Sequence, residues 1–223
     1  MIMKKFFTLI AAVAMAASVN AQTITFEKAT AGSVPASIAK DGLVLTLTDP
    51  ENKISVDENT AYFGTADSPI KFVTRLKTGG KSTTQKNYLT LTVPSDGTLK
   101  VYARTGKNSD TKRNIILTQD GTQLIDKILL ESEAVKATVE GETEQKSVYP
   151  AVSVAVKKGD VVITYPTNSV NIYGIELATA TGVSSVSVAE AKAKTATFNL
   201  AGQQVSESYK GIVVKNGKKY LNK

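Results

Sequence analysis

Apolar and polar residues alternate over several short stretches in the middle of the chain. The alternation is clearest at residues 43–48 (Leu-Val-Leu-Thr-Leu-Thr), 88–93 and 98–104. A period of two predicts β-strands, because successive side chains of a strand point to opposite faces of its sheet. Further short runs, many of them rich in β-branched and aromatic residues, are residues 70–76, 114–118, 152–156, 161–165 and 170–177.

Turn-forming residues separate these runs. Asp41-Gly42, Asp96-Gly97 and Asp120-Gly121 are dipeptides typical of tight hairpins, and Lys158-Gly159-Asp160 is another sharp break. Residues 123–139 have mixed apolar spacing, and we interpret them as strand and loop rather than as a helix. Short strands with frequent Gly/Asp turns predict an all-β sandwich rather than alternating strands and helices.

A change in composition after Ala178 predicts a domain boundary. Residues 179–195 contain no aromatic residue and are rich in Ala, Thr, Ser, Val and Lys, which suits a linker. In residues 196–223, Asn216-Gly217 lies between two apolar stretches, which indicates a β-hairpin. We therefore expect a sandwich domain at residues 22–178, a linker, and a small C-terminal β-hairpin domain that is marginally stable alone.

The first 21 residues have the three parts of a secretory signal peptide. Lys4 and Lys5 precede an apolar stretch at residues 6–17, and Val19 and Ala21 are small residues before a cleavage point. A membrane anchor is the alternative, but the apolar stretch is shorter than the roughly 20 residues that span a bilayer. We expect cleavage after Ala21, no transmembrane segment in the mature chain, and a location outside the cell or on the outer-membrane surface.

The positive charge is concentrated at the C-terminal end. Of the formal charge of +7, two lysines belong to the signal peptide, and residues 179–223 hold seven lysines against two glutamates. Residues 22–178 contain 18 basic and 18 acidic residues and are therefore neutral. A nucleic-acid-binding domain concentrates basic residues on its main body, so nucleic acid is not an expected partner.

Several residue types that carry chemistry are missing. The chain has no His and no Cys, which removes the commonest general base, the thiolate nucleophile and soft metal sites. Trp is also absent, and eight tyrosines remain as possible stacking residues for a sugar. Glu131, Glu133, Glu140, Glu142 and Glu144 cluster in a polar stretch that we interpret as a solvated loop, not as a hydrolase site.

The C-terminal segment resembles a known export domain. Residues 198–205 (Phe-Asn-Leu-Ala-Gly-Gln-Gln-Val), 211–214 (Gly-Ile-Val-Val) and 216–220 (Asn-Gly-Lys-Lys-Tyr) carry the resemblance. They are similar to the C-terminal sorting domains of proteins exported by the type IX secretion system of Bacteroidetes-type bacteria. The resemblance implies contact with that secretion machinery, and a small hairpin that caps the sandwich is the alternative.

The larger segment resembles a family of carbohydrate-binding modules. Residues 74–80, 99–104 and 170–177 (Val-Asn-Ile-Tyr-Gly-Ile-Glu-Leu) look like the jelly-roll modules that accompany pectate lyases and other polysaccharide enzymes. The resemblance implies a β-sandwich, an aromatic binding platform and in some members a structural calcium. Glu27 and the turn with Asp49, Glu51 and Asn52 offer oxygen ligands, but their spacing matches no calcium motif, so we expect no cofactor.

The alternation in residues 98–104 also indicates a possible binding surface on one face of the predicted strand. If Leu99, Val101 and Ala103 face the core, then Lys100, Tyr102 and Arg104 share the opposite face. A tyrosine between two cations could stack on a sugar while the cations meet a carboxylate, and an ordinary solvated sheet face is the alternative. The surface is expected to extend to neighbouring strands through Arg75, Lys77 and Arg113.

Tyr173 is expected to differ from Tyr102. It alternates with Ile175 and Leu177, so we expect it to pack inward with its hydroxyl reaching a polar partner. The leading hypothesis is a secreted or cell-surface non-catalytic protein that binds a polysaccharide, possibly an acidic one. A structural or protein-interaction module of the cell surface, without glycan binding, is the alternative.

Overall fold

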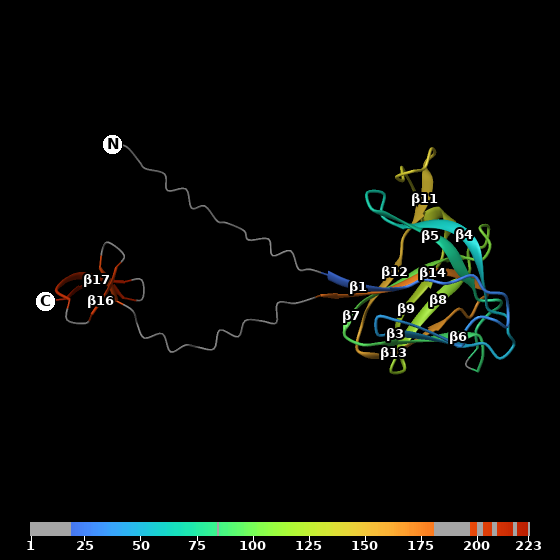
Figure 1. Ribbon diagram of the computed structural model, residues 1–223, viewed down its shortest axis with the longest axis horizontal. Coiled ribbons are helices and arrows are strands. Elements are labelled where there is room, and N and C mark those ends of the chain that lie inside the picture. The colour runs from blue at the N-terminus through green and yellow to red at the C-terminus, as the bar shows by residue number, and fades with distance from the viewer. Residues whose placement is uncertain are drawn as a thin grey trace. The chain divides into compact units, whose positions relative to one another are not determined.

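The computed structural model describes residues 19–83, 85–180, 197–199, 203–206, 209–215 and 218–222. The chain divides into two compact units, Met1–Thr181 and Gly182–Lys223, which we describe separately. The larger unit is an all-β sandwich of two sheets, as the alternation predicts (Figure 1).

The first sheet has eight strands. Most of them follow the order β10 (Val135–Ala137), β11 (Lys146–Tyr149), β4 (Ser55–Gly64), β5 (Pro69–Lys77), β14 (Val170–Ala180), β7 (Gly97–Thr105) and β12 (Val152–Val156). The eighth strand, β1 (Val19–Ile24), pairs with the second half of β14. In Figure 1, β11 stands out from the body of the sandwich, above β4 and β5.

The second sheet has six strands. Their order is β2 (Ser37–Lys40), β3 (Leu43–Thr48), β6 (Tyr88–Val93), β13 (Gly159–Thr164), β8 (Asn114–Gln119) and β9 (Thr122–Ile128). A single 3-10 turn, η1 (Glu131–Glu133), follows β9. Residues 123–139 are thus strand, turn and loop, which confirms that interpretation.

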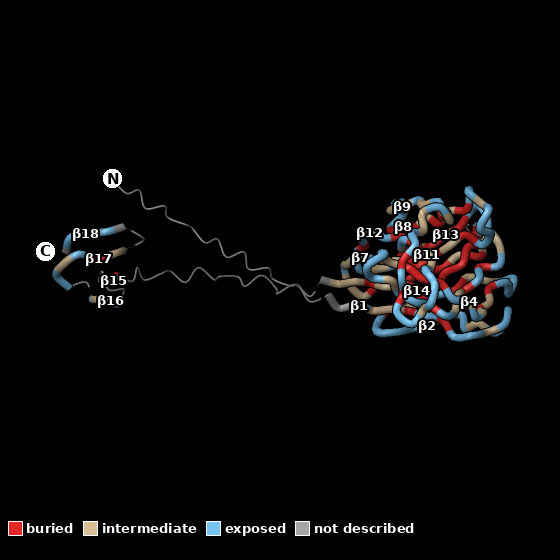
Figure 2. Tube along the Cα trace, turned by 90° about the horizontal axis from the view of Figure 1, so that it is seen from above, coloured by how far each residue is buried: buried red, intermediate tan, exposed pale blue. Residues whose placement is uncertain are grey.

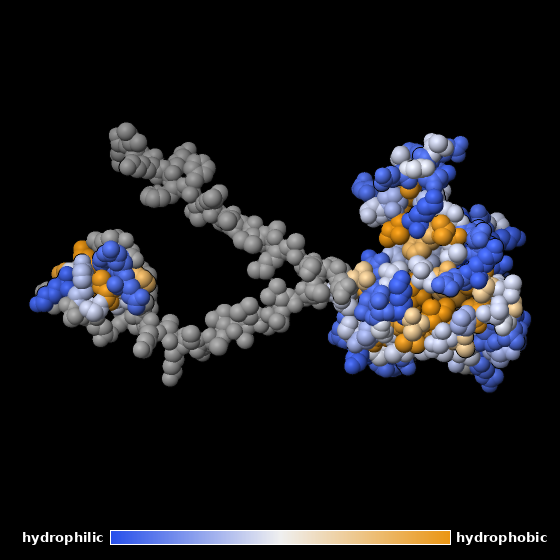
Figure 3. Space-filling view, in the orientation of Figure 1, coloured by the Kyte–Doolittle hydropathy of each residue, from blue (hydrophilic) through white to orange (hydrophobic). Residues whose placement is uncertain are grey.

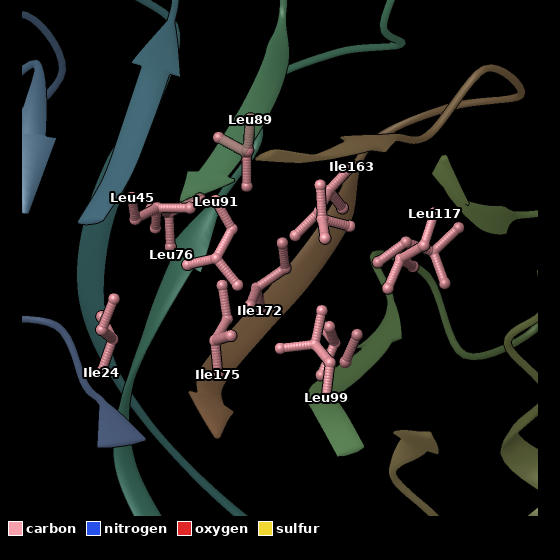
Figure 4. Close-up of a cluster of buried hydrophobic side chains, with 14 of the residues drawn as sticks. Ile24, Leu45, Leu76, Leu89, Leu91, Leu99, Leu117, Ile163, Ile172 and Ile175 are labelled. Atoms are coloured by element: carbon pink, nitrogen blue, oxygen red, sulfur yellow. The ribbon is translucent and has the colours of Figure 1, made fainter. Parts of the chain in front are cut away.

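The main core lies between the two sheets (Figure 4). Leu45, Leu89, Leu91, Leu117 and Ile163 come from the second sheet, and they meet Ile24, Leu76, Leu99, Ile172 and Ile175 of the first. In β3, β6, β8 and β13 these side chains are buried at every second position, so the alternation in the sequence matches one buried face of the second sheet. In β14, Ile172 and Ile175 are three residues apart. Figure 2 shows the buried residues concentrated inside this unit.

The four predicted turns fall into two kinds of connection, hairpins within one sheet and crossings between the two sheets. Asp41-Gly42 and Asp120-Gly121 have positive φ at both residues and close the β2–β3 and β8–β9 hairpins, as predicted. Asp96-Gly97 and Lys158-Gly159 are not hairpin turns, because each carries the chain from one sheet to the other. The two crossings meet: the Asp96 carboxylate accepts a hydrogen bond from the Lys158 backbone N–H.

The first sheet curls strongly. β5 pairs with β14 only at Leu76 and Lys77, and beyond that point β1 takes its place along β14. The rings of Phe63 on β4 and Tyr102 on β7 are 5.7 Å apart between centroids, although β5 and β14 lie between their strands. A flat sheet would separate them by roughly 14 Å. The outer face of this sheet, which points away from the sandwich core, is therefore concave.

Both predicted boundaries of the sandwich fall within strands. β14 continues to Ala180, two residues past the expected boundary, because β1 pairs with it to that point. The cleavage site predicted after Ala21 lies in the middle of β1, and residues 1–18 of the expected signal peptide lie outside the described residues. Within the part of the chain that is described, no helix is long and apolar enough to cross a membrane.

The C-terminal unit is a small four-stranded sheet. Its order is β16 (Gln204–Val205), β15 (Thr197–Asn199), β17 (Gly211–Lys215) and β18 (Lys218–Asn222). Lys215 lies opposite Lys218, which confirms the hairpin expected there. Among the described residues of this unit, only Thr197 and Val213 are buried, so its core is very small. The expected linker lies almost entirely outside the described residues.

Candidate functional site

The candidate residues of β7 leave the sandwich core, as the alternation predicts. Leu99, Val101 and Ala103 belong to the core between the sheets. Lys100, Tyr102 and Arg104 therefore point to the concave outer face of the first sheet. What covers that face decides whether they can meet a ligand.

Tyr102 is not an exposed platform, and that prediction is wrong. Only 1% of Tyr102 is exposed, and its ring belongs to a second apolar cluster on the concave face. We call this set the aromatic cluster: Phe63, Phe72, Tyr102, Tyr149 and Tyr173. The ring of Tyr102 lies 4.8 Å from that of Phe72 and 5.7 Å from that of Phe63, measured between centroids. A sugar ring has no access to its face.

The curl of the sheet explains the error. Phe63 and Phe72 come from β4 and β5, which bend over β14 and β7. Gly174 of β14 makes room for this packing, since a Cβ there would lie 2.6 Å from Cε1 of Phe72. Alternation along a single strand identifies the face of a side chain, but it does not reveal another strand folded over that face.

Tyr173 is buried as expected, but on the other side of the sheet. A β-bulge between Ile172 and Gly174 shifts the register of β14, so Ile172 and Ile175 enter the sandwich core while Tyr173 joins the aromatic cluster. Its hydroxyl donates a hydrogen bond to Oδ1 of Asn59 at 2.6 Å. Burial raises the pKa of Tyr173, and the nearby guanidinium groups of Arg104 and Arg75 oppose that rise.

Lys100 and Tyr102 share one carboxylate. Nζ of Lys100 lies 2.8 Å from Oε1 of Glu176, and the Tyr102 hydroxyl donates to Oε2 of Glu176 at 2.6 Å. Burial alone would raise the pKa of Glu176, but the hydrogen bonds from Lys100 and Tyr102 outweigh it and lower the pKa. Burial and the bond to Glu176 raise the pKa of Tyr102. The positive charge of Lys100 is thus already matched.

Arg104 is held in a similar arrangement. Its Nη2 donates to both carboxylate oxygens of Glu131, at 2.9 and 3.1 Å, and its guanidinium carbon lies 4.1 Å from the centre of the Tyr149 ring. The Tyr149 hydroxyl donates to Oε2 of the same Glu131. Burial is the larger cause and the bond to Glu131 the second, and together they raise the pKa of Tyr149 to about 12. Glu131, expected in a solvated loop, is in fact the anchor of this group.

Arg75 and Lys77 also have a carboxylate partner. Both lie within ion-pair distance of Asp57 on β4, and Nε of Arg75 is 2.8 Å from Oδ1 of Asp57. The hydrogen bond from Arg75 lowers the pKa of Asp57, against the effect of burial. The two residues do share a face with the β7 residues, but they form a neutralising cluster rather than an open cationic surface.

Arg113 does not belong to this face. It lies directly before β8 in the second sheet and is 8% exposed. Its guanidinium bonds Oδ2 of Asp110 and both the backbone oxygen and Oγ of Ser169. Arg113 therefore holds two loops together, and the prediction that it extends the binding surface is wrong.

An open groove remains beside Lys100. It has a volume of about 380 Å³ and lies between the β4–β5 turn and the start of β12. Its walls are formed by Gly64, Thr65, Ser68, Ile70, Lys100, Tyr102, Pro150, Ala151 and Ser153. The paired strands β10 and β11 project from the sandwich, and Figure 3 shows apolar surface at the base of this projection, among polar side chains. Apart from Lys100 and Tyr102, sequence analysis did not single out these residues. Thr65, Ser68, Pro150 and Ala151 lie on connections, and Gly64, Ile70 and Ser153 lie at or near strand ends, where alternation carries no binding signal.

No candidate metal centre is found among the described residues. They contain no group of three or more carboxylates close enough to hold a metal ion. Asp49 accepts the backbone N–H groups of Lys53 and Ile54, and Glu51 pairs with Lys53 and Lys86, so these turn residues serve the turn itself. Glu142 is bound by Tyr62, Lys71 and Lys146.

No family model matches this chain, and no curated protein matches it in sequence.

Proposed function

We propose that this chain is a secreted or cell-surface, non-catalytic protein that binds a polysaccharide. The observation that carries the proposal is the open groove between the β4–β5 turn and β12. Its volume of about 380 Å³ lies within the range of roughly 300–1,000 Å³ found for small-molecule sites.

The lining of the groove suits a sugar. Ile70, Pro150 and Ala151 provide apolar contact for the C–H faces of a sugar ring. Thr65, Ser68 and Ser153 are exposed hydroxyls that can donate and accept hydrogen bonds. Because Lys100 is already paired with Glu176, the groove has no unmatched charge that would require an acidic sugar.

The surface of the C-terminal unit is consistent with docking to a protein of the export machinery. Five of the nine exposed large apolar residues among the described residues belong to it: Phe198, Tyr209, Ile212, Tyr220 and Leu221. Exposed apolar residues concentrated in so small a unit favour a docking role. This supports the proposed contact with a secretion machinery.

One observation favours the alternative of a protein-interaction module. A hollow of about 490 Å³ runs beside β2, the edge strand of the second sheet, with Thr25–Ala29 on its other side. An edge strand offers unpaired backbone groups to an extended peptide. This alternative predicts no polysaccharide binding and slower hydrogen exchange in β2 when cell-envelope proteins are added.

The test is affinity electrophoresis of residues 22–223 against a panel of neutral and acidic polysaccharides. Ser153→Arg fills the groove, and Ala155→Arg is the matched control, since Ala155 is exposed on the same strand but does not line the groove. We expect binding to at least one polymer, weakened about tenfold by Ser153→Arg and unchanged by Ala155→Arg. Absence of binding to every polymer would contradict the proposed function.

A further inference from the structure

The outer face of the second sheet has an unusual composition. Its four central strands are β3, β6, β13 and β8, of which β3, β6 and β13 lie along the lower side of the sandwich in Figure 1. Their outward side chains are Val44, Thr46, Thr48, Tyr88, Thr90, Thr92, Asp160, Val162, Thr164, Asn114, Ile116 and Thr118, and none of them is buried. Six of these twelve are threonines, and only Asp160 is charged. We call this surface the threonine face.

Strand register arranges the threonine face in rows. Thr46 lies opposite Thr90, Thr90 opposite Val162, and Val162 opposite Thr118. In the next row, Thr48 lies opposite Tyr88, and Thr164 lies opposite Ile116. Neighbouring strands are about 4.8 Å apart, so each row presents hydroxyl or methyl groups at that regular interval.

Most of the threonine hydroxyls are free. Thr92 donates to Oδ1 of Asp160 at 2.5 Å, at one end of the face. Thr46, Thr90, Thr118 and Thr164 make no side-chain hydrogen bond to any described residue of the protein. Each hydroxyl can therefore donate one hydrogen bond and accept two. Threonine is stiff at χ1 in a strand, so ordering these groups on binding costs little entropy.

We propose that the threonine face is a second binding surface, which takes an extended, uncharged polysaccharide laid across the strands. The inference rests on the proposed polysaccharide-binding function and adds a site on the opposite side of the sandwich. A face without net charge in its central rows offers nothing to an acidic polymer or to a charged peptide. A neutral sugar chain matches it, because it too alternates hydroxyl groups with C–H surface.

The size of the face argues against a second copy of this chain as its occupant. Four strands of about five residues cover roughly 300 Å². A stable protein–protein interface takes about 800 Å² from each partner. A single polysaccharide chain needs no such area, and simultaneous binding at the groove would add avidity.

The test compares variants of residues 22–223 on neutral and acidic polysaccharides. Thr90→Lys with Thr118→Lys places two charges in one row, and Thr90→Val with Thr118→Val removes the hydroxyls at nearly constant shape. Thr122→Lys is the control, since Thr122 is exposed on β9 beside the hairpin turn and outside the rows. We expect the lysine pair to weaken binding to a neutral polymer about tenfold or more and the valine pair to weaken it several-fold. Circular dichroism melting should show that the variants stay folded.

The outcomes separate this inference from the proposed function. If the lysine pair binds neutral polymers as tightly as the unchanged protein while Ser153→Arg does not, the inference is overturned and the groove stands. If only the threonine-face variants lose binding, the inference stands and the groove is not the site. Binding to acidic polymers alone overturns the inference. Self-association that the lysine pair abolishes, measured by sedimentation, also overturns it and identifies a second copy as the occupant.

Discussion

The outer faces of the two sheets are formed by strands with the same alternating sequence pattern, but they differ in shape, burial and charge. The outer face of the first sheet is concave, filled by the aromatic cluster, and edged by ion pairs at Lys100, Arg104 and Arg75. The threonine face of the second sheet carries free hydroxyls and almost no charge. The difference shows that a side chain can leave the sandwich core without reaching solvent.

The largest expected difference comes from truncating one residue on each face. Tyr102→Ala should lower the free energy of unfolding by roughly 3–5 kcal/mol, because it removes a buried ring and leaves a cavity beside the rings of Phe63 and Phe72. Thr90→Ala should change it by no more than about 0.5 kcal/mol. Urea denaturation followed by circular dichroism measures both. Equal, small effects would show that the aromatic cluster is not a second core.

Enlarging a glycine tests the close packing under Phe72. Gly174→Ala brings a Cβ to 2.6 Å from Cε1 of Phe72 and should cost about 1–3 kcal/mol. Gly80→Ala is the control, because the nearest atom to its Cβ is Nδ2 of Asn87, at 3.8 Å. Thermal melting of the two variants should separate them by several degrees. A stable Gly174→Ala protein would contradict the curled arrangement of β5 over β14.

Removing a charge on each face should have a smaller effect. Glu176→Gln leaves Lys100 without its ion pair and weakens the bond from Tyr102, so we expect a loss of about 1–2 kcal/mol. Asp160→Asn, exposed on the threonine face, should cost less than about 0.5 kcal/mol. Equilibrium unfolding at neutral pH is the measurement, and the opposite ranking would contradict the assignment of these roles.

Acid should affect the first sheet before the second. The pKa of Glu142 is lowered from 4.5 to about 2 by hydrogen bonds from Lys71, Tyr62 and Lys146. A lowered folded-state pKa means that the stabilisation is complete above pH 4.5 and is lost as the pH falls toward 2. The protection factors of the β11 amides, which correct for the intrinsic pH dependence of exchange, should therefore fall over this range, and Glu142→Gln should remove that fall. Unchanged protection factors in β3 and β6 serve as the control.

Much of the fold could be predicted from the sequence because the alternation of apolar and polar residues identifies most of its strands. Strands β3, β6 and β8 are regular alternations that each bury one face. β7 keeps the alternation because Lys100 and Arg104 are polar, although Tyr102 between them is buried, and the bounds of all four strands match closely. β4 could not be found in this way, since Ala61, Tyr62 and Phe63 are buried in succession between two different clusters. A strand that is covered on both faces loses the period of two.

The candidate site was less predictable, for a related reason. The residues of β7 and β5 that point outward were identified correctly, but their partners Glu176, Glu131 and Asp57 come from other elements. Pairing between distant segments depends on the curl of the sheet, and no local pattern encodes the curl. The bulge at Tyr173 shows the same limit, because one shifted residue moves a side chain to the opposite face.

If the chain is cleaved after Ala21, strand β1 limits when that cleavage can take place. Ala21 and Gln22 lie opposite Ala178 and Leu177, so the bond between them is part of a β-ladder once the sandwich has formed. A peptidase that cuts there would have to act on the unfolded chain or wait for local opening. Folding that is faster than cutting therefore removes the bond from the peptidase, whereas cutting that is faster leaves the shortened chain free to fold. If cleavage after Ala21 takes place at all, a chain that folds first would keep residues 1–21.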